Sequence, residues 1–449
     1  MLRPIGTLHP PFYIPEGAVL VGGAVRDLLL GRRPTDLDLL AKDPKKAAQE
    51  AVLRLSGRLF PLDEERRLYR VVTPRGLTLD FAPLEDLEKD LLSRDFRLNA
   101  LVLLGRLVLG PFGAKEDLKG RRLEPVREEN LYQDHLRSLR GVRLSTTLGL
   151  GLGPGARAAL ARHARHLQAH PEDRPAPERV QSELERLLLS PRAAHGFLLM
   201  DRLGLLEVYL PELARTRGVP QLGRHFLDVL DHSLSVLFHL LWLYPQAPLA
   251  LRLAALLHDL GKATTGVWDE EKGRYRFLGH EKESARLAEA LLLRLRFPKK
   301  VVERVKALVL AHMHAPPSTP RGLRRFFLRR SDLLPDLLYL QAADRLARAG
   351  GEAEAWALLD LAEAFRTAPP PSRPLLSGEE VMALLGLSPG PEVGRALRRL
   401  LLAQAEGRVT SKEEARAFLI PPHPGLRQDG GPGKALPKPS DETPDAKKL

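Results

Sequence analysis

Residues 19–40, with the sequence VLVGGAVRDLLLGRRPTDLDLL, decide the fold of the N-terminal part of the chain. An apolar run ends at Gly22-Gly23 and is followed at once by helical spacing, which predicts a buried strand that turns directly into a helix. Backbone N–H groups at the start of such a helix, together with the helix dipole, favour a bound phosphate. Gly23 lets the backbone approach a ligand closely, and Arg26 lies one turn into the helix. A tight turn without a ligand is the alternative.

The same stretch ends in two aspartates, Asp36 and Asp38, that are separated by one residue. Side chains alternate along a strand, so both carboxylates lie on one face. Two hard oxygen ligands on one face suit Mg²⁺, which also takes oxygens from substrate phosphates. Asp80, in the strand-like segment LTLDFAP, could add a third carboxylate, and metals held in this way activate an attacking hydroxyl and stabilise a leaving pyrophosphate. A D-x-D pattern also occurs in turns and on solvated strand edges.

Composition limits the class of protein. The chain of 449 residues is long enough for several domains, and its net charge of +13 points to a polyanionic partner or to a basic surface without a dedicated one. Cysteine is absent, which excludes disulfides and thiolate metal sites and fits a cytoplasmic protein. No apolar stretch of about 18 residues and no secretory h-region is present, so we expect no membrane partner.

Periodicity divides the chain into a mixed part and a helical part. Strand patterns and helical patterns alternate up to about residue 125, whereas Leu and Arg recur at helical spacing from Gln133 almost to the end, with one possible hairpin at 267–279. The predicted strands cover 18–23, 35–41, 67–73 and 77–83, and the predicted helices follow Gly23 and cover 44–56. The fold class is therefore α+β, with a small mixed α/β head followed by all-α regions.

Four charged residues recur with period three and are predicted to project from adjacent faces of one helix: Asp134, Arg137, Arg140 and Arg143. One interpretation is a basic helix surface with an ion pair worth a few tenths of a kcal/mol. The other is base recognition, because a carboxylate accepts from an exocyclic amine and a guanidinium donates to ring acceptors. Such a pair fits cytosine and adenine but opposes the donor and acceptor order of uracil and guanine.

Two motifs resemble those of a known family. Residues 22–40 resemble the first motif of the class II tRNA nucleotidyltransferase and bacterial poly(A) polymerase family, whose head is polymerase-β-like. Residues 88–101, EKDLLSRDFRLNAL, are similar to the family's R-R-D-F-x-x-N-A-L motif, with Ser93 in place of the first arginine.

Two further motifs follow in the family's order. Residues 110–126, GPFGAKEDLKGRRLEPV, look like its D-P-x-G-G…D-L element, with Gly110 where the family usually has Asp. Residues 133–144, QDHLRSLRGVRL, look like E-D-x-x-R-x-x-R-x-x-R-F, with Gln133 and Leu144 as conservative departures.

The resemblance implies roles for individual residues. Asp36 and Asp38 would hold Mg²⁺ and be catalytic, Asp134 and Arg137 would read the base, and Arg140 and Arg143 would contact phosphate. The triphosphate and sugar of the nucleotide would be held by Gly23, Arg26 and Arg94.

The helical part contains a second candidate site. His232, the dipeptide His258-Asp259 and Asp344 resemble the HD metal-dependent phosphohydrolase superfamily, and His280 and His312 could complete a second metal position. Imidazole and carboxylate together suit a transition metal such as Mn, Ni or Fe, or Mg²⁺. A hydrogen-bonded core pair is the alternative for an isolated His-Asp dipeptide.

The resemblance also implies a domain order. We expect a nucleotidyltransferase head at 1–130, a helical neck at 131–215, an HD body at 216–350 and a helical tail at 351–420. Residues 421–449 are Pro, Gly and charged residues with almost nothing apolar, and this composition predicts a disordered tail. Segments 178–213 and 387–419 are similar to the family's neck and C-terminal elements, and their Arg-rich helices are suited to follow an RNA backbone.

Within this family, the number of nucleotides that an enzyme adds depends on a loop before the R-D-F motif. Members that add C, C and A have a flexible loop before the R-D-F motif, whereas only residues 81–93 separate Asp80 from Arg94 here. The chain therefore resembles members that add two cytidines from CTP to a tRNA lacking its 3′ CCA end and leave the A to a separate enzyme. Full CCA addition, A addition from ATP, a poly(A) polymerase, and an RNA-binding HD phosphohydrolase with a degenerate head remain alternatives.

Overall fold

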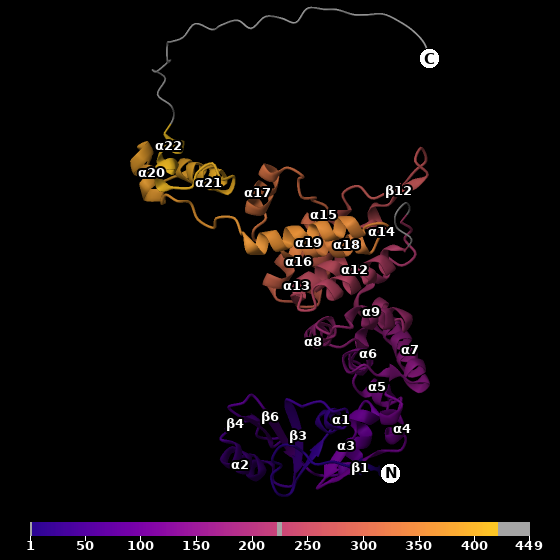
Figure 1. The fold of residues 1–449 in the computed structure, drawn as a ribbon. Helices are drawn as coiled ribbons and strands as arrows, with labels where there is room; N and C mark the ends of the chain where they lie inside the picture. The colour runs from indigo at the N-terminus through magenta and orange to yellow at the C-terminus, as the bar shows by residue number, and fades with distance from the viewer. Residues whose placement is uncertain (1, 222–226, 421–449) are drawn as a thin grey trace, which may run out of the picture. The chain divides into compact units, whose positions relative to one another are not determined.

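The computed structural model describes residues 2–221 and 227–420, which form two compact units (Figure 1). The first unit comprises the residues up to Pro316 together with Arg330–Pro369, and the second comprises Pro317–Arg329 and the residues from Pro370 onward. The predicted tail at 421–449 lies outside the described residues. The α+β class is confirmed, and the five-segment division remains a prediction.

The first unit begins with an eight-stranded sheet in the order β1-β8-β7-β2-β3-β6-β5-β4. Neighbouring strands are antiparallel except for β3 and β6, which run parallel. The four predicted strands are confirmed as β2, β3, β5 and β6. The strands are β1 Leu2–Thr7, β2 Ala18–Val21, β3 Asp36–Ala41, β4 Arg58–Asp63, β5 Leu68–Val72, β6 Thr78–Pro83, β7 Val102–Leu104 and β8 Leu107–Pro111.

Short helices pack on this sheet and complete the head. The predicted helices are confirmed as α1 (Gly23–Leu29) and α2 (Pro44–Leu55), and α3 (Leu87–Ser93), a 3₁₀ turn η1 (Arg97–Asn99) and α4 (Ala114–Lys119) follow. Alanines of α2 pack on the buried leucines of β3 and β6, so one face of the sheet is covered. On the opposite face of β3, Leu40 packs in a second cluster with Val21 and Leu91, and the start of the strand is left for polar side chains.

The rest of the first unit is helical (Figure 1). The predicted hairpin is confirmed as β11 (Val267–Asp269) and β12 (Arg274–Arg276), and a two-residue strand β10 (Gly151–Leu152) pairs with β9 (Arg122–Leu123). The helices are α5 Asn130–Gln133, α6 Arg137–Leu148, α7 Pro154–Ala169, η2 Pro171–Asp173, α8 Pro177–Leu188, α9 Ala193–Arg202, α10 Leu206–Tyr209, α11 Pro211–Ala214, α12 Val229–Leu243, α13 Leu249–Leu257, α14 Lys262–Thr265, α15 His280–Arg294, α16 Lys299–Ala311, α18 Asp336–Leu346 and α19 Glu352–Thr367.

The second unit is a small helical body with its own core. It contains α17 (Pro320–Arg329), α20 (Gly378–Leu385), α21 (Pro391–Ala405) and α22 (Lys412–Leu419), and the core is built from Leu and Val side chains of the last three helices. Glu406 binds Arg321 at 3.1 Å and Arg408 at 2.7 Å, and it also contacts Arg325. These ion pairs tie α17 to the end of α21.

None of the helices within residues 2–221 and 227–420 combines the length and the apolar character that crossing a bilayer requires.

Candidate active site and metal centre

The two aspartates of β3 lie on the polar face of the head sheet. Leu37 and Leu39 are buried in the core, so the alternation along the strand turns Asp36 and Asp38 to the other face, as the sequence predicts. β6 runs parallel to β3 in a register that places Asp80 beside Asp38. The strand pairing therefore brings all three predicted carboxylates together.

The electrostatics distinguish Asp38 from Asp80. Surrounding protein raises the pKa of the Asp38 carboxyl even though solvent still reaches it; the Arg94 guanidinium opposes this, and Asp80 and Asp36 reinforce it. Asp80 instead receives two hydrogen bonds of 2.7 Å from Arg70. Arg70 neutralises Asp80. The two carboxylates whose mutual repulsion a divalent cation would relieve are therefore Asp36 and Asp38, and their oxygen ligands fit Mg²⁺.

Arg70 is a site residue that the sequence reasoning missed. It lies on β5 directly opposite Asp80 in the antiparallel β5–β6 pair. A basic residue in one predicted strand and an acidic residue in the next are a signal for such a cross-strand pair. The signal needs the pairing register, which the two strand patterns alone do not specify.

The glycine turn brings Arg94 next to the carboxylates. Gly22 has φ 76°, and a Cβ at this position would collide with the Arg94 guanidinium and lie 3.4 Å from Asp38 Oδ2. Arg94 also binds Asp90 at 3.0 Å. Only glycine combines this conformation with this approach, so Gly22, rather than Gly23, is the position at which the turn strictly requires glycine.

Arg26 lies in the same site but is engaged by protein partners. It is buried, donates two hydrogen bonds of 2.8 and 2.7 Å to Asp27 Oδ1, and contacts Asn99 Oδ1. Asn99 also donates to Asp95 at 2.9 Å. Asn99 is a second residue that sequence reasoning did not single out, although it stands in the R-R-D-F-x-x-N-A-L motif. The Arg26–Asn99 contact joins α1 to η1.

The structure corrects the prediction that Asp134 shares one helix with the three arginines. α6 begins at Arg137, and Asp134 precedes it in extended backbone (φ −146°, ψ 101°). Its side chain accepts a hydrogen bond of 3.2 Å from the Leu136 N–H, and an aspartate that binds a nearby backbone N–H competes with helix formation. Arg179 of α8 holds the Asp134 carboxylate with contacts of 3.0 and 2.9 Å.

Arg137 is anchored by backbone carbonyls. One guanidinium nitrogen donates to the carbonyls of Ser93 and Asn130 at 2.9 and 2.8 Å, and burial lowers the pKa of this arginine. Its Nε is buried with no hydrogen-bond partner among the described residues. A buried donor without a partner favours a ligand that accepts from it.

Arg140 and Arg143 meet a glutamate that sequence reasoning missed. Arg143 binds Glu183 of α8 at 2.7 Å, and Arg140 binds Glu183 at 3.4 Å and Asp95 at 3.3 Å. Glu183 is buried. In this structure the two arginines therefore join α6 to α8 and to the head.

The second site is a buried cluster of imidazoles and carboxylates from five helical segments. His232 Nε2 lies 3.0 Å from Asp344 Oδ1 and 3.7 Å from Asp259 Oδ2, and His258 Nε2 lies 3.2 Å from Asp259. His280 and His312 approach the other oxygen of Asp259 at 3.3 and 3.9 Å. All six predicted HD residues are thus brought together, and Asp259 is shared between two groups of possible metal ligands.

The hydrogen bonds of three histidines in this cluster use Nδ1 and direct Nε2 toward the centre of the cluster. The Nδ1 atoms of His258, His280 and His312 lie 3.0, 2.8 and 2.6 Å from backbone carbonyls, which directs each Nε2 inward. His258 Nε2 and His280 Nε2 are buried without a hydrogen-bond partner within the described part of the chain, and Lys262 Nζ lies 2.7 Å from Asp259 Oδ2. Burial opposes ionisation of Asp259, but His258 and Lys262 hold its pKa well below the usual range. The cluster therefore fits a divalent metal.

A pocket of about 350 Å³ opens onto this cluster. The pocket lining includes three residues of the cluster, Asp259, His280 and His312. It also includes four basic residues that contribute positive charge: Lys262, Arg274, Arg276 and Arg348. A pocket with these walls suits an anionic ligand such as a phosphate.

Comparison with known proteins finds matches to the segments that contain the two sites. Residues 18–84 match the model described as "Poly A polymerase head domain", residues 152–216 match "Probable RNA and SrmB- binding site of polymerase A", and residues 229–349 match "HD domain". The chain is 64% identical to the CC-adding tRNA nucleotidyltransferase of Thermus thermophilus over 411 residues, covering 91% of this chain and 94% of that protein. The chain belongs to the tRNA nucleotidyltransferase family.

Other relatives of this tRNA nucleotidyltransferase differ in the nucleotide that they add. The A-adding tRNA nucleotidyltransferase of Deinococcus radiodurans is 46% identical, with 91% of this chain and 96% of that protein covered. The crystal structure of the Bacillus stearothermophilus CCA-adding enzyme in complex with CTP superposes with a TM-score of 0.64 and 26% identity, covering 90% of this chain and 92% of that one. The predicted fold and nucleotidyltransferase class are confirmed, and both domains imply the use of divalent metal.

Proposed function

We propose that this tRNA nucleotidyltransferase adds two cytidines from CTP to the 3′ end of a tRNA lacking CCA, and that a separate enzyme adds the final A. The observation that carries the proposal is the connection between β6 and α3. β6 ends at Pro83 and α3 begins at Leu87, so only residues 84–86 link them. The relative at 64% identity bears the name of a CC-adding enzyme.

The short link between β6 and α3 affects the choice between CTP and ATP, because it determines whether the base-reading groups can move. Asp134 is held by two contacts to Arg179, and Arg137 is held by two carbonyls, so both groups are fixed in place. One rigid arrangement fits one size of base, and a change from cytosine to the larger adenine needs a mobile element that repositions it. The three-residue link leaves no room for such an element between β6 and α3.

The chemistry follows from the head residues. The tRNA 3′-oxygen forms a bond to the α-phosphorus of CTP as the bond to the pyrophosphate oxygen breaks, and the hydroxyl proton is released. Mg²⁺ at Asp36 and Asp38 would favour ionisation of the hydroxyl and neutralise the leaving group. Arg94, next to Asp38 at the Gly22 turn, is positioned to hold the triphosphate. Asp134 would accept from the cytosine amine, and Arg137 would donate to its ring acceptors.

The deciding experiment uses three tRNAs that end before CCA, after one C and after two C. Each is incubated with Mg²⁺ and with CTP, ATP or both. The proposal expects CTP to extend the first substrate by two nucleotides and the second by one, with negligible extension of the third. Efficient addition of a single A to the third substrate would contradict it and indicate an A-adding or CCA-adding enzyme, and long A tails would indicate a poly(A) polymerase.

A second activity is proposed for the HD cluster because of its orphaned buried ligands and its basic pocket. We propose metal-dependent hydrolysis of phosphate esters, with 2′,3′-cyclic phosphate or 3′-phosphate RNA ends as substrates and Mn, Ni, Fe or Mg as the metal. The measurement is release of phosphate, or opening of the cyclic ester, with each metal added to chelator-treated protein. Equal rates in the wild type and in Asp259→Asn would remove this proposal.

A further inference from the structure

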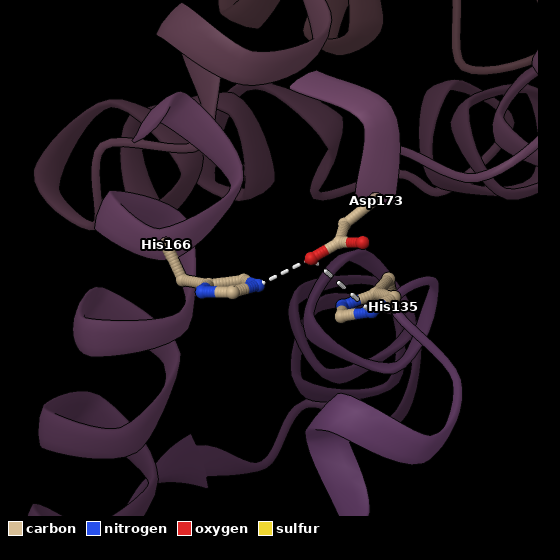
Figure 2. A group of neighbouring side chains, drawn as sticks. All are labelled: His135, His166 and Asp173. Carbon is tan, nitrogen blue, oxygen red and sulfur yellow. Dashed lines mark hydrogen bonds and ion pairs between the residues drawn. The ribbon is translucent and has the colours of Figure 1, made fainter. Parts of the chain in front are cut away.

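A third group of possible metal ligands lies in the neck and consists of residues that neither site uses. His135 stands in the link between α5 and α6, His166 lies on α7, and Asp173 lies in η2. Figure 2 shows both imidazoles directed at the Asp173 carboxylate from different segments. The three side chains are partly buried, with 23, 27 and 37% of their surface exposed, so an ion can enter from solvent.

The distances in this neck cluster are close to those of a tetrahedral site. His166 Nε2 lies 2.6 Å from Asp173 Oδ2, and His135 Nε2 lies 3.9 Å from the same oxygen. Ligand atoms bound at about 2.0–2.1 Å in tetrahedral geometry are separated by roughly 3.3–3.4 Å. The two observed distances lie on either side of that value, and ligand atoms of the three residues all lie within 4.8 Å of one another, so side-chain rotations would bring them to bonding distance.

His163 orients the His135 ring so that its Nε2 is turned toward Asp173. His135 Nδ1 lies 3.0 Å from Nε2 of the buried His163, so a hydrogen bond occupies the ring nitrogen that faces away from Asp173. The rings of His135, His163 and His166 are nearly parallel, and Tyr132 contacts all three edge-on. A partner on the second ring nitrogen and packed ring faces are the usual support for an imidazole that binds a metal.

We propose that His135, His166 and Asp173 bind a divalent transition metal of the zinc class, with the fourth position open to water. Two imidazoles and one carboxylate match the ligand preference of Zn²⁺ and its neighbours, whereas Mg²⁺ prefers oxygen ligands alone. The metal joins the segment that carries Asp134, the residue before His135, to α7 and η2. Its role is structural, and it does not depend on which nucleotide the enzyme adds.

The test uses the full-length chain without an affinity tag, with the HD cluster disabled by His258→Gln and Asp259→Asn. After treatment with a chelator, the protein is equilibrated with Zn²⁺ in excess Mg²⁺, separated from free metal and analysed for zinc. A parallel titration with Co²⁺ records the visible absorption of tetrahedral cobalt. The proposal expects a single equivalent of zinc, and at least about a tenfold weaker affinity in His166→Gln and in Asp173→Asn.

The matched control is His170→Gln. His170 follows α7, binds Glu172 at 3.2 Å and is not among the three ligands, so this variant should retain the zinc. If the disabled HD cluster prevents folding, as a thermal melt would show, the comparison is made with the HD cluster intact, and His166→Gln should lose one equivalent relative to the wild type. Absence of zinc from the HD-disabled folded protein, or equal zinc in His166→Gln and its parent, would overturn the proposal.

Discussion

The head and the HD cluster both gather carboxylates, but they gather them in opposite surroundings. Asp36 and Asp38 lie on an open strand face that solvent reaches, with Arg94 beside them. Asp259 and Asp344 are buried among imidazoles whose outer nitrogens meet backbone carbonyls. An open pair of hard ligands suits a metal that arrives with a triphosphate and leaves with pyrophosphate. A buried imidazole-rich set suits a metal that stays.

The largest effect is expected from the head carboxylates. Asp36→Asn or Asp38→Asn should lower the rate of CMP incorporation by about three orders of magnitude or more, because one ligand of the reactive metal is lost. Fold, tRNA affinity and metal content at the HD cluster should stay unchanged. Incorporation is measured with a labelled tRNA at saturating Mg²⁺, where substantial residual activity would mean that these carboxylates do not hold the reactive metal.

The converse substitution tests the independence of the HD cluster. Asp259→Asn removes the carboxylate that both ligand groups share, so bound transition metal and phosphohydrolase activity should be lost. CMP incorporation should change by no more than about twofold, because the head residues are not altered. His314→Gln is the control, since His314 lies two residues beyond His312 and outside both ligand groups. A parallel loss of CMP incorporation in Asp259→Asn would show that the two sites are coupled.

Base selection is expected to show an intermediate effect. Arg137→Ala should reduce the preference for CTP over UTP by about tenfold or more, since a guanidinium that reads a base edge contributes about 1–3 kcal/mol of discrimination. The measurement is kcat/KM for each nucleotide on one tRNA. Arg162→Ala, which removes an exposed ion pair with Glu128, is the control. If the preference of Arg137→Ala equals that of the wild type, the residue serves only to anchor α6.

Some contacts of the head and the neck follow from local sequence patterns, and others do not. Period-two alternation was sufficient to place Asp36 and Asp38 on one face, because that face follows from local geometry. The pairing of Arg70 with Asp80 depends on strand register, and the pairing of Arg143 with Glu183 depends on how two helices pack. Both are tertiary choices that local spacing does not encode.

The start of α6 shows why a period can mislead. The four charged residues have period three, but Asp134 binds the Leu136 N–H and leaves the helix. An aspartate is suited to this position because its short side chain reaches a nearby backbone N–H. The HD cluster was predictable as a set because its residue types are unusual in a core, whereas the carbonyls that orient its imidazoles depend on the backbone path.

The smallest expected effect concerns the stability of the head without metal. The pKa of Asp38 is raised in the folded state, so the folded protein binds this proton more tightly than the unfolded chain does. Asp38 therefore stabilises the fold fully only below its unfolded pKa, and that contribution is lost as the pH rises through the folded pKa. At neutral pH the ionised Asp38 is destabilising, and Asp38→Asn should raise the melting temperature of the metal-free protein.

The increase should be on the order of 1–2 °C, because solvent screens a carboxylate that it can reach. It should vanish at acidic pH, where the wild-type carboxyl is protonated, and Mg²⁺ should reverse the order by stabilising only the wild type. Melting curves of both proteins, recorded with and without Mg²⁺ across this pH range, provide the measurement. A variant less stable than the wild type at neutral pH without metal would show that Asp38 supports the fold. In that case the head carboxylates would differ from those of the HD cluster only in their exposure to solvent. Repulsion between Asp38 and its neighbouring carboxylates would then not be the reason why the head binds a metal.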